Sequence, residues 1–100
     1  MITYKDSIQL IQDSFDGLQR GGMIQEKITV DGNTCLLGDN SVLDSIGFVT
    51  LFSEIEDRII QKIDEEVYLV LDEIGEFDIN APFLSAEILA KYIVSKTNSK

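Results

Sequence analysis

Ser45 is the residue whose type and position best suit chemistry. It follows Asp44, a good helix N-cap, and opens an apolar periodic segment, so its hydroxyl is expected at the mouth of a helix. The positive end of a helix dipole stabilises an anion by about 0.3 to 1 kcal/mol at an exposed site. The chain has no His, so Ser45 lacks an evident base and is a poor catalyst of its own reaction. We predict that it accepts a phosphate ester made by another enzyme.

A helix over residues 45–63 is the clearest prediction of local structure. Its apolar positions recur every three or four residues: Phe48, Phe52, Ile55, Ile59 and Ile63. This spacing is typical of an amphipathic helix whose apolar side faces a core. On the polar side, Glu54 and Arg58 form an i,i+4 pair, expected to contribute about 0.2 to 0.5 kcal/mol.

Helical spacing also predicts a helix on each side of this one. The first lies within residues 2–18 and ends at Gly21 and Gly22, because glycine commonly follows a helix. The last follows Ser85, which caps or begins it, and covers the run AEILAKYIVSK. Its inward-facing residues are expected to be Ile88, Leu89, Tyr92 and Ile93.

The segments between the predicted helices lack a comparable period. Residues 23–43 are expected to form a long loop with apolar anchors, which allows a short strand at 27–30 and a turn at Asp31–Gly32. Residues 67–71 allow an extended segment, and residues 72–80 a loop or a short helix.

Length and composition limit the prediction to one domain. The chain has 100 residues, of which 44% are hydrophobic, enough for one small core. We predict an all-α fold over residues 1–100, a small bundle of three main helices and at most one short fourth helix, joined by long loops. The tail over about 96–100 is expected to fray.

Charge and residue usage exclude several classes of function. Eight Lys and Arg residues against 18 Asp and Glu residues give a formal net charge of −10, which disfavours nucleic-acid binding. The single Cys35 cannot close a disulfide within the chain, and the first residues do not resemble a signal peptide. No apolar run is long enough for a membrane span. We expect a cytoplasmic protein that binds neither nucleic acid nor membrane.

The net charge lies in the middle of the chain, between Asp39 and Asp78. Within this window, Glu54 and Asp57 are three residues apart on the predicted helix and share a face, which Glu56 widens. We predict that these three acids guide basic partners toward Ser45. The alternative is that the acidic residues form a solvated face that keeps the protein soluble.

The segment around Ser45 resembles a known family. Asp44, Ser45 and Ile46, followed by Gly47, are similar to the D-S-L signature of acyl carrier proteins. The resemblance covers most of the chain over residues 36–93. Ile46 replaces the usual leucine, and the segments 21–37 and 67–78 are longer than in the smallest family members.

This resemblance implies a standalone carrier with an acyl-carrier-like bundle, not an enzyme, in lipid or secondary metabolite biosynthesis. Such a phosphoprotein would hold an acyl or aminoacyl group as a thioester on 4′-phosphopantetheine attached to Ser45, beside Asp44 and Ile46. Its implied partners are a phosphopantetheinyl transferase and acyl-loading, acyl-transferring or condensing enzymes, and it would be a monomer. The resemblance also implies that core side chains could part to admit the cargo: Val49, Ile55, Ile74, Leu89 and Ile93.

Four other interpretations are weighed against this one. The chain could be an unmodified acidic adaptor that keeps the carrier fold and only binds partners, with Ser45 a capping residue. A carboxylate-based hydrolase would need a pocket that fixes two acids, and no such pair is indicated. Cys35 suits a small hydrophobic position better than a nucleophile, and no segment has the ligand spacing of an EF-hand, so no metal site is predicted.

Overall fold

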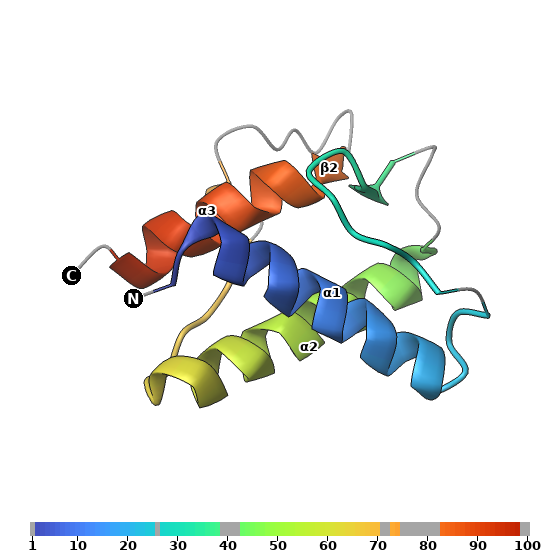
Figure 1. Ribbon diagram of the computed structural model, residues 1–100, viewed down its shortest axis with the longest axis horizontal. Helices are drawn as coiled ribbons and strands as arrows, with labels where there is room; N and C mark the ends of the chain where they lie inside the picture. Colours follow the sequence, from blue (N-terminus) through green and yellow to red (C-terminus); the bar gives the residue numbers. More distant parts are fainter. Residues whose placement is uncertain (1, 26, 39–42, 71–72, 75–82, 99–100) are drawn as a thin grey trace.

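The computed structural model describes residues 2–25, 27–38, 43–70, 73–74 and 83–98 (Figure 1). This part of the chain is mostly helical, which confirms the predicted all-α bundle of three main helices. The elements, in chain order, are α1 (Tyr4–Arg20), β1 (Cys35–Leu37), α2 (Ser45–Ile63), β2 (Leu84–Ser85) and α3 (Ala86–Asn98). Helix α1 packs against both α2 and α3.

Local side-chain chemistry explains where α1 and α2 begin and end. Thr3 and Asp6 form a reciprocal capping box at the start of α1, with both bonds at 3.1 Å, and Gly21 caps its end. Asp44 caps the start of α2. Asp64 ends α2 in the left-handed conformation, with φ of 54°, a common way to terminate a helix.

Apart from β1, the described residues between α1 and α2 form a loop, as predicted, and Gln12 of α1 anchors its backbone. Residues 27–30 form no strand, because the side chain of Gln12 on α1 takes the place of a neighbouring strand. Its amide donates to the carbonyl of Ile28 and accepts from the N–H of Val30, both at 2.7 Å. The strand lies instead at β1, which pairs antiparallel with β2. The predicted turn at Asp31–Gly32 is present, closed by the bond from the N–H of Thr34 to the carbonyl of Asp31 at 3.1 Å.

The first turn of α3 is fixed by this same loop. The N–H groups of Ala86 and Glu87 donate to the carbonyls of Thr34 and Gly32, at 2.9 and 3.0 Å. The hydroxyl of Ser85 accepts from the N–H of Ile88 at 3.3 Å, as its predicted capping role requires. These bonds satisfy helix N–H groups that have no partner within the helix.

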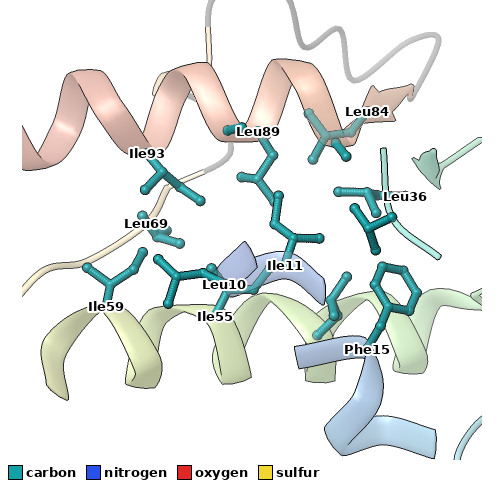
Figure 2. Close-up of a cluster of buried hydrophobic side chains, with 14 of the residues drawn as sticks. Leu10, Ile11, Phe15, Leu36, Ile55, Ile59, Leu69, Leu84, Leu89 and Ile93 are labelled. Atoms are coloured by element: carbon teal, nitrogen blue, oxygen red, sulfur yellow. The ribbon is translucent and has the colours of Figure 1, made fainter. Parts of the chain in front are cut away.

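The core lies where α1, α2 and α3 meet (Figure 2). Leu89 and Ile93 are fully buried, as predicted, whereas Ile88 and Tyr92 are half-buried. Leu69, from the segment after α2, lies between Ile59 of α2 and Ile93 of α3. The wider core also includes Leu10, Ile11, Phe15, Leu36, Leu51, Ile55 and Leu84.

The segment of residues 67–70, here called the strap, runs between α2 and α3. Val67 and Leu69 are buried, whereas Tyr68 and Val70 are exposed. This alternation fits the extended segment allowed by the sequence, although the strap pairs with no strand among the residues that the structure describes. The predicted loop or short helix over 72–80 lies largely outside the described residues.

The expected fraying is not seen at residues 96–98. Helix α3 continues to Asn98, whose side-chain amide donates to the carbonyl of Ile2 at 3.3 Å. Lys96 is also held by an ion pair to Glu73. The fraying expected for residues 99–100 falls outside the described part of the chain.

Candidate functional site

Residue 45 is the first residue of α2, as the sequence predicted. The carboxylate of Asp44 accepts a hydrogen bond from the N–H of Gly47 at 2.6 Å, and the carbonyl of Asp44 accepts from the N–H of Phe48 at 2.9 Å. Asp44 therefore caps the helix with both its side chain and its backbone. This arrangement places residue 45 at the positive end of a helix of 19 residues.

A groove of about 250 Å³ lies beside the start of α2. We call it the Ser45 groove, because two of its residues flank Ser45 in the chain. It is lined by Met23, Ile24, Leu43, Asp44, Ile46 and Gly47. The groove is formed by the loop after α1 on one side and the beginning of α2 on the other, and its lining is mainly apolar.

Gly47 lies close to two side chains at the start of α2. A Cβ atom at this position would lie 3.1 Å from Asp44 Oδ1 and 3.3 Å from Leu43 Cδ2. A larger residue would therefore disturb both the capping carboxylate and a wall of the Ser45 groove.

Apolar side chains are exposed around the same end of α2. Ile46 is 72% exposed, Val49 is 62% exposed and Met23 is 46% exposed. Ile46, which follows residue 45 in the chain, thus faces solvent. Val49 differs from the expectation that it belongs to an internal path for cargo, because it faces solvent. The other members of that expected path, Ile55, Ile74, Leu89 and Ile93, are buried in the core.

The three predicted acidic residues have different surroundings. The carboxylate of Glu54 forms an ion pair with Arg58 at 3.2 Å. Glu56 is half-buried, and its carboxylate accepts a hydrogen bond from the N–H of Leu69 at 2.8 Å. Asp57 is exposed. Glu56 therefore holds the strap against α2 as well as contributing charge, a role that sequence spacing did not reveal.

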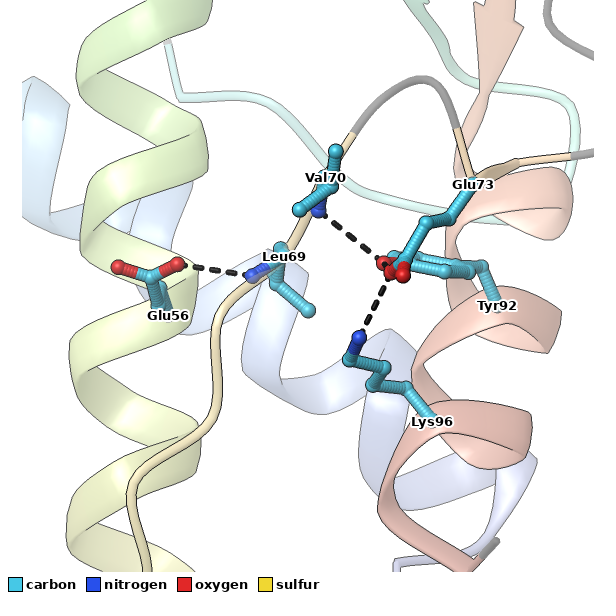
Figure 3. Close-up of polar contacts among 6 residues, drawn as sticks. All are labelled: Glu56, Leu69, Val70, Glu73, Tyr92 and Lys96. Atoms are coloured by element: carbon cyan, nitrogen blue, oxygen red, sulfur yellow. Dashed lines mark hydrogen bonds and ion pairs between the residues drawn. The ribbon is translucent and has the colours of Figure 1, made fainter.

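A second polar cluster holds the other side of the strap (Figure 3). The hydroxyl of Tyr92 accepts from the N–H of Val70 at 3.1 Å and donates to Glu73 at 2.6 Å. Lys96 donates to the same carboxylate oxygen, also at 2.6 Å. We call Glu73, Tyr92 and Lys96 the clasp. It was missed from the sequence because Glu73 and Lys96 are far apart in the chain and no local period links them.

The clasp shifts the titration of its members. Hydrogen bonds from Lys96 and then Tyr92 hold the pKa of Glu73 below its usual value, and the bond to Glu73 raises the pKa of Lys96. Burial, followed by the bond to Glu73, raises the pKa of Tyr92. All three shifts favour the protonation states that keep the clasp closed at neutral pH.

Other candidate chemistry is not assembled in the described part of the chain. Over those residues, no group of three or more His, Cys, Asp or Glu side chains could hold a metal ion. Cys35 is half-buried in β1, where its thiol lies 3.4 Å from the carbonyl oxygen of Leu37. No described helix has both the length and the apolar character needed to cross a membrane.

Comparison with known proteins gives no relative: no family model, no curated protein and no solved structure matches this chain.

Proposed function

We propose that this chain is a carrier protein that holds an acyl or aminoacyl group on a 4′-phosphopantetheine arm attached to Ser45. The observation that carries the proposal is the start of α2, where Asp44 caps the helix and makes residue 45 its first residue. A serine at this place lies at the positive end of a helix, which suits a phosphate diester. The arm supplies the thiol that carries the cargo.

The surroundings of Ser45 support attachment by a separate enzyme. The carboxylate of Asp44 accepts the Gly47 N–H and so serves as the helix cap, and the chain has no His to act as a base for Ser45. In the loading step, the bond between the Ser45 oxygen and phosphorus forms while the diphosphate bond of coenzyme A breaks. Adenosine 3′,5′-bisphosphate leaves with the electron pair, and a base of the transferase takes the serine proton.

The remaining features favour delivery of cargo over catalysis. Exposed Ile46, Val49 and Met23 offer an apolar contact surface around the helix start, and Asp57 adds an exposed negative charge about three turns later. A transferase, or an enzyme that loads, transfers or condenses acyl groups, could use both features.

Mass spectrometry after incubation with coenzyme A and a broad-specificity phosphopantetheinyl transferase tests the proposal. The wild-type chain should gain the mass of one arm, and Ser45→Ala should gain none. Ser53→Ala is a matched control, because Ser53 is exposed on the same helix. Labelling of Ser45→Ala, or no labelling of folded wild type, would refute the attachment site. The second result would instead favour the unmodified acidic adaptor.

A further inference from the structure

We propose that the Ser45 groove is the resting place of the pantetheine part of the arm. This inference rests on the proposed function and adds where the arm lies when no partner is bound. The occupant is an uncharged chain with two amides and a pair of geminal methyl groups, rooted at Ser45.

The position of the groove relative to Ser45 supports this assignment. Asp44 and Ile46, the two chain neighbours of Ser45, both line the groove. An arm attached to Ser45 would therefore start from a residue whose two chain neighbours line the groove. Met23 and Ile24 form the opposite wall and come from the loop that is longer than the resemblance predicted.

The chemistry of the lining favours an uncharged occupant. Four of the lining residues are apolar, namely Met23, Ile24, Leu43 and Ile46. Among the lining residues that the structure describes, Asp44 is charged and already accepts the Gly47 N–H, and none is Lys or Arg. A free anion would therefore meet no positive side chain there, whereas methyl groups would cover exposed apolar surface.

The interior of the bundle is a less favourable place for the arm. Ile55, Leu89 and Ile93 are fully buried, and Leu69 of the strap fills the space between Ile59 and Ile93 (Figure 2). Entry between α2 and α3 would require displacement of the strap, which Glu56 and the clasp hold by hydrogen bonds. The Ser45 groove can take the arm without disturbing the core.

Nuclear Overhauser measurements on the chain loaded from coenzyme A test the location. Mass spectrometry first establishes that the arm is present, so failure of loading counts against the proposed function alone. With the arm in place, its geminal methyl protons should show contacts to the Met23 and Ile46 methyl groups. Contacts to Leu69 or Ile74, or no contacts to the protein, would overturn the groove assignment while leaving attachment intact.

A pair of substitutions makes the test specific. Met23→Lys places a solvated charge at the groove wall and should abolish the contacts between the arm and Ile46. Val70→Lys is the matched control, since Val70 is 42% exposed against 46% for Met23 and lies on the strap. Loaded Val70→Lys should keep those contacts. Retention of the contacts in loaded Met23→Lys, or equal loss in both variants, would also contradict the assignment.

Discussion

The carboxylate of Glu73 and the phenol of Tyr92 are joined by a hydrogen bond of 2.6 Å. Because Tyr92 also accepts the N–H of Val70, this bond connects the strap to α3 through one side chain. Glu56 holds the adjacent residue, Leu69, from α2. Two successive backbone N–H groups of the strap are thus bound to side chains of two different helices.

Removal of the Tyr92 hydroxyl should loosen the strap. We expect Tyr92→Phe to lower the free energy of unfolding by about 0.5 to 1.5 kcal/mol, because two hydrogen bonds are lost at a half-buried site. Chemical denaturation measures this loss, and hydrogen exchange at Val70 should become faster. Tyr68→Phe is the control, since that exposed hydroxyl bonds only Glu66 among the described contacts and its loss should cost less than about 0.5 kcal/mol. Equal costs for the two variants would contradict a special role for Tyr92.

The clasp should make stability depend on acid pH. Because the pKa of Glu73 is lower in the folded chain, its contribution is complete above the unfolded value of about 4.3 and is lost as pH falls through the folded value. Urea unfolding at a series of acid pH values measures this loss. The free energy of unfolding should fall less steeply with falling pH for Glu73→Gln than for wild type. Some dependence should remain, because Thr3 also lowers the pKa of Asp6. Glu87→Gln, which removes only the exposed pair with Lys91, is the control. If the free energy of unfolding depends on pH equally steeply in Glu73→Gln and wild type, the clasp does not contribute to the acid dependence of stability.

Gly17 offers a test of the contact between α1 and α2. A Cβ atom there would lie 3.3 Å from Arg58 Nη2 and 3.5 Å from Glu54 Oε1. The end of an arginine side chain can move by a few tenths of an ångström, whereas alanine in a helix is favoured over glycine by about 0.8 to 1.0 kcal/mol. We therefore expect Gly17→Ala to raise the unfolding midpoint by thermal denaturation. A lower midpoint would mean that Arg58 is held rigidly against α1.

A substitution at Asp57 tests whether the acidic residues of α2 attract a basic partner enzyme toward Ser45. Glu56→Lys would also release Leu69, so it would confuse docking with stability. If the proposed loading of Ser45 occurs, Asp57→Lys should slow it several-fold, and added salt should slow wild type in the same sense. Glu87→Lys makes the same change of charge on an exposed residue of α3 and should have a smaller effect. Initial rates of arm attachment at limiting transferase give the comparison. If Asp57→Lys and Glu87→Lys slow arm attachment equally, the effect comes from the net charge of the protein and not from the position of Asp57.

The helices could be predicted because their signals are local. The sequence predicts a helix over residues 45–63, with Asp44 as its N-cap, from the cap residue and the regular apolar spacing. The structure has α2 at the same residues. The exposure of Val49 to solvent could not be predicted from that spacing, because it depends on where α1 and α3 lie. Val49 is exposed although it belongs to an apolar run.

Contacts between distant segments were not predicted. The run at 27–30 allowed a short strand, although a loop was the preferred prediction and is what the structure has. The amide of Gln12 bonds the backbone of Ile28 and Val30 there, and no pattern at Gln12 indicates this. The clasp and the bond from Glu56 to Leu69 likewise join polar residues that are ordinary in their own segments. At the candidate site, the cap at Asp44 follows from local sequence, whereas the exposure of Ile46 and the place of Met23 in the groove depend on the fold.

The pairing of β1 with β2 closes a loop that contains all of α2, and closure of so long a loop slows the formation of this strand pair during folding. Closure of a long loop loses chain entropy before its contacts form, so such pairs tend to form late in folding. We expect Leu36→Ala to accelerate unfolding with little change in the refolding rate, which gives a low φ-value in stopped-flow experiments. A high φ-value would place the two strands in the folding nucleus. If the strands pair late, the hydrogen bonds from the N–H groups of Ala86 and Glu87 to the carbonyls of Thr34 and Gly32 would also form late. The start of α3 would then be the last part of the bundle to reach its native structure.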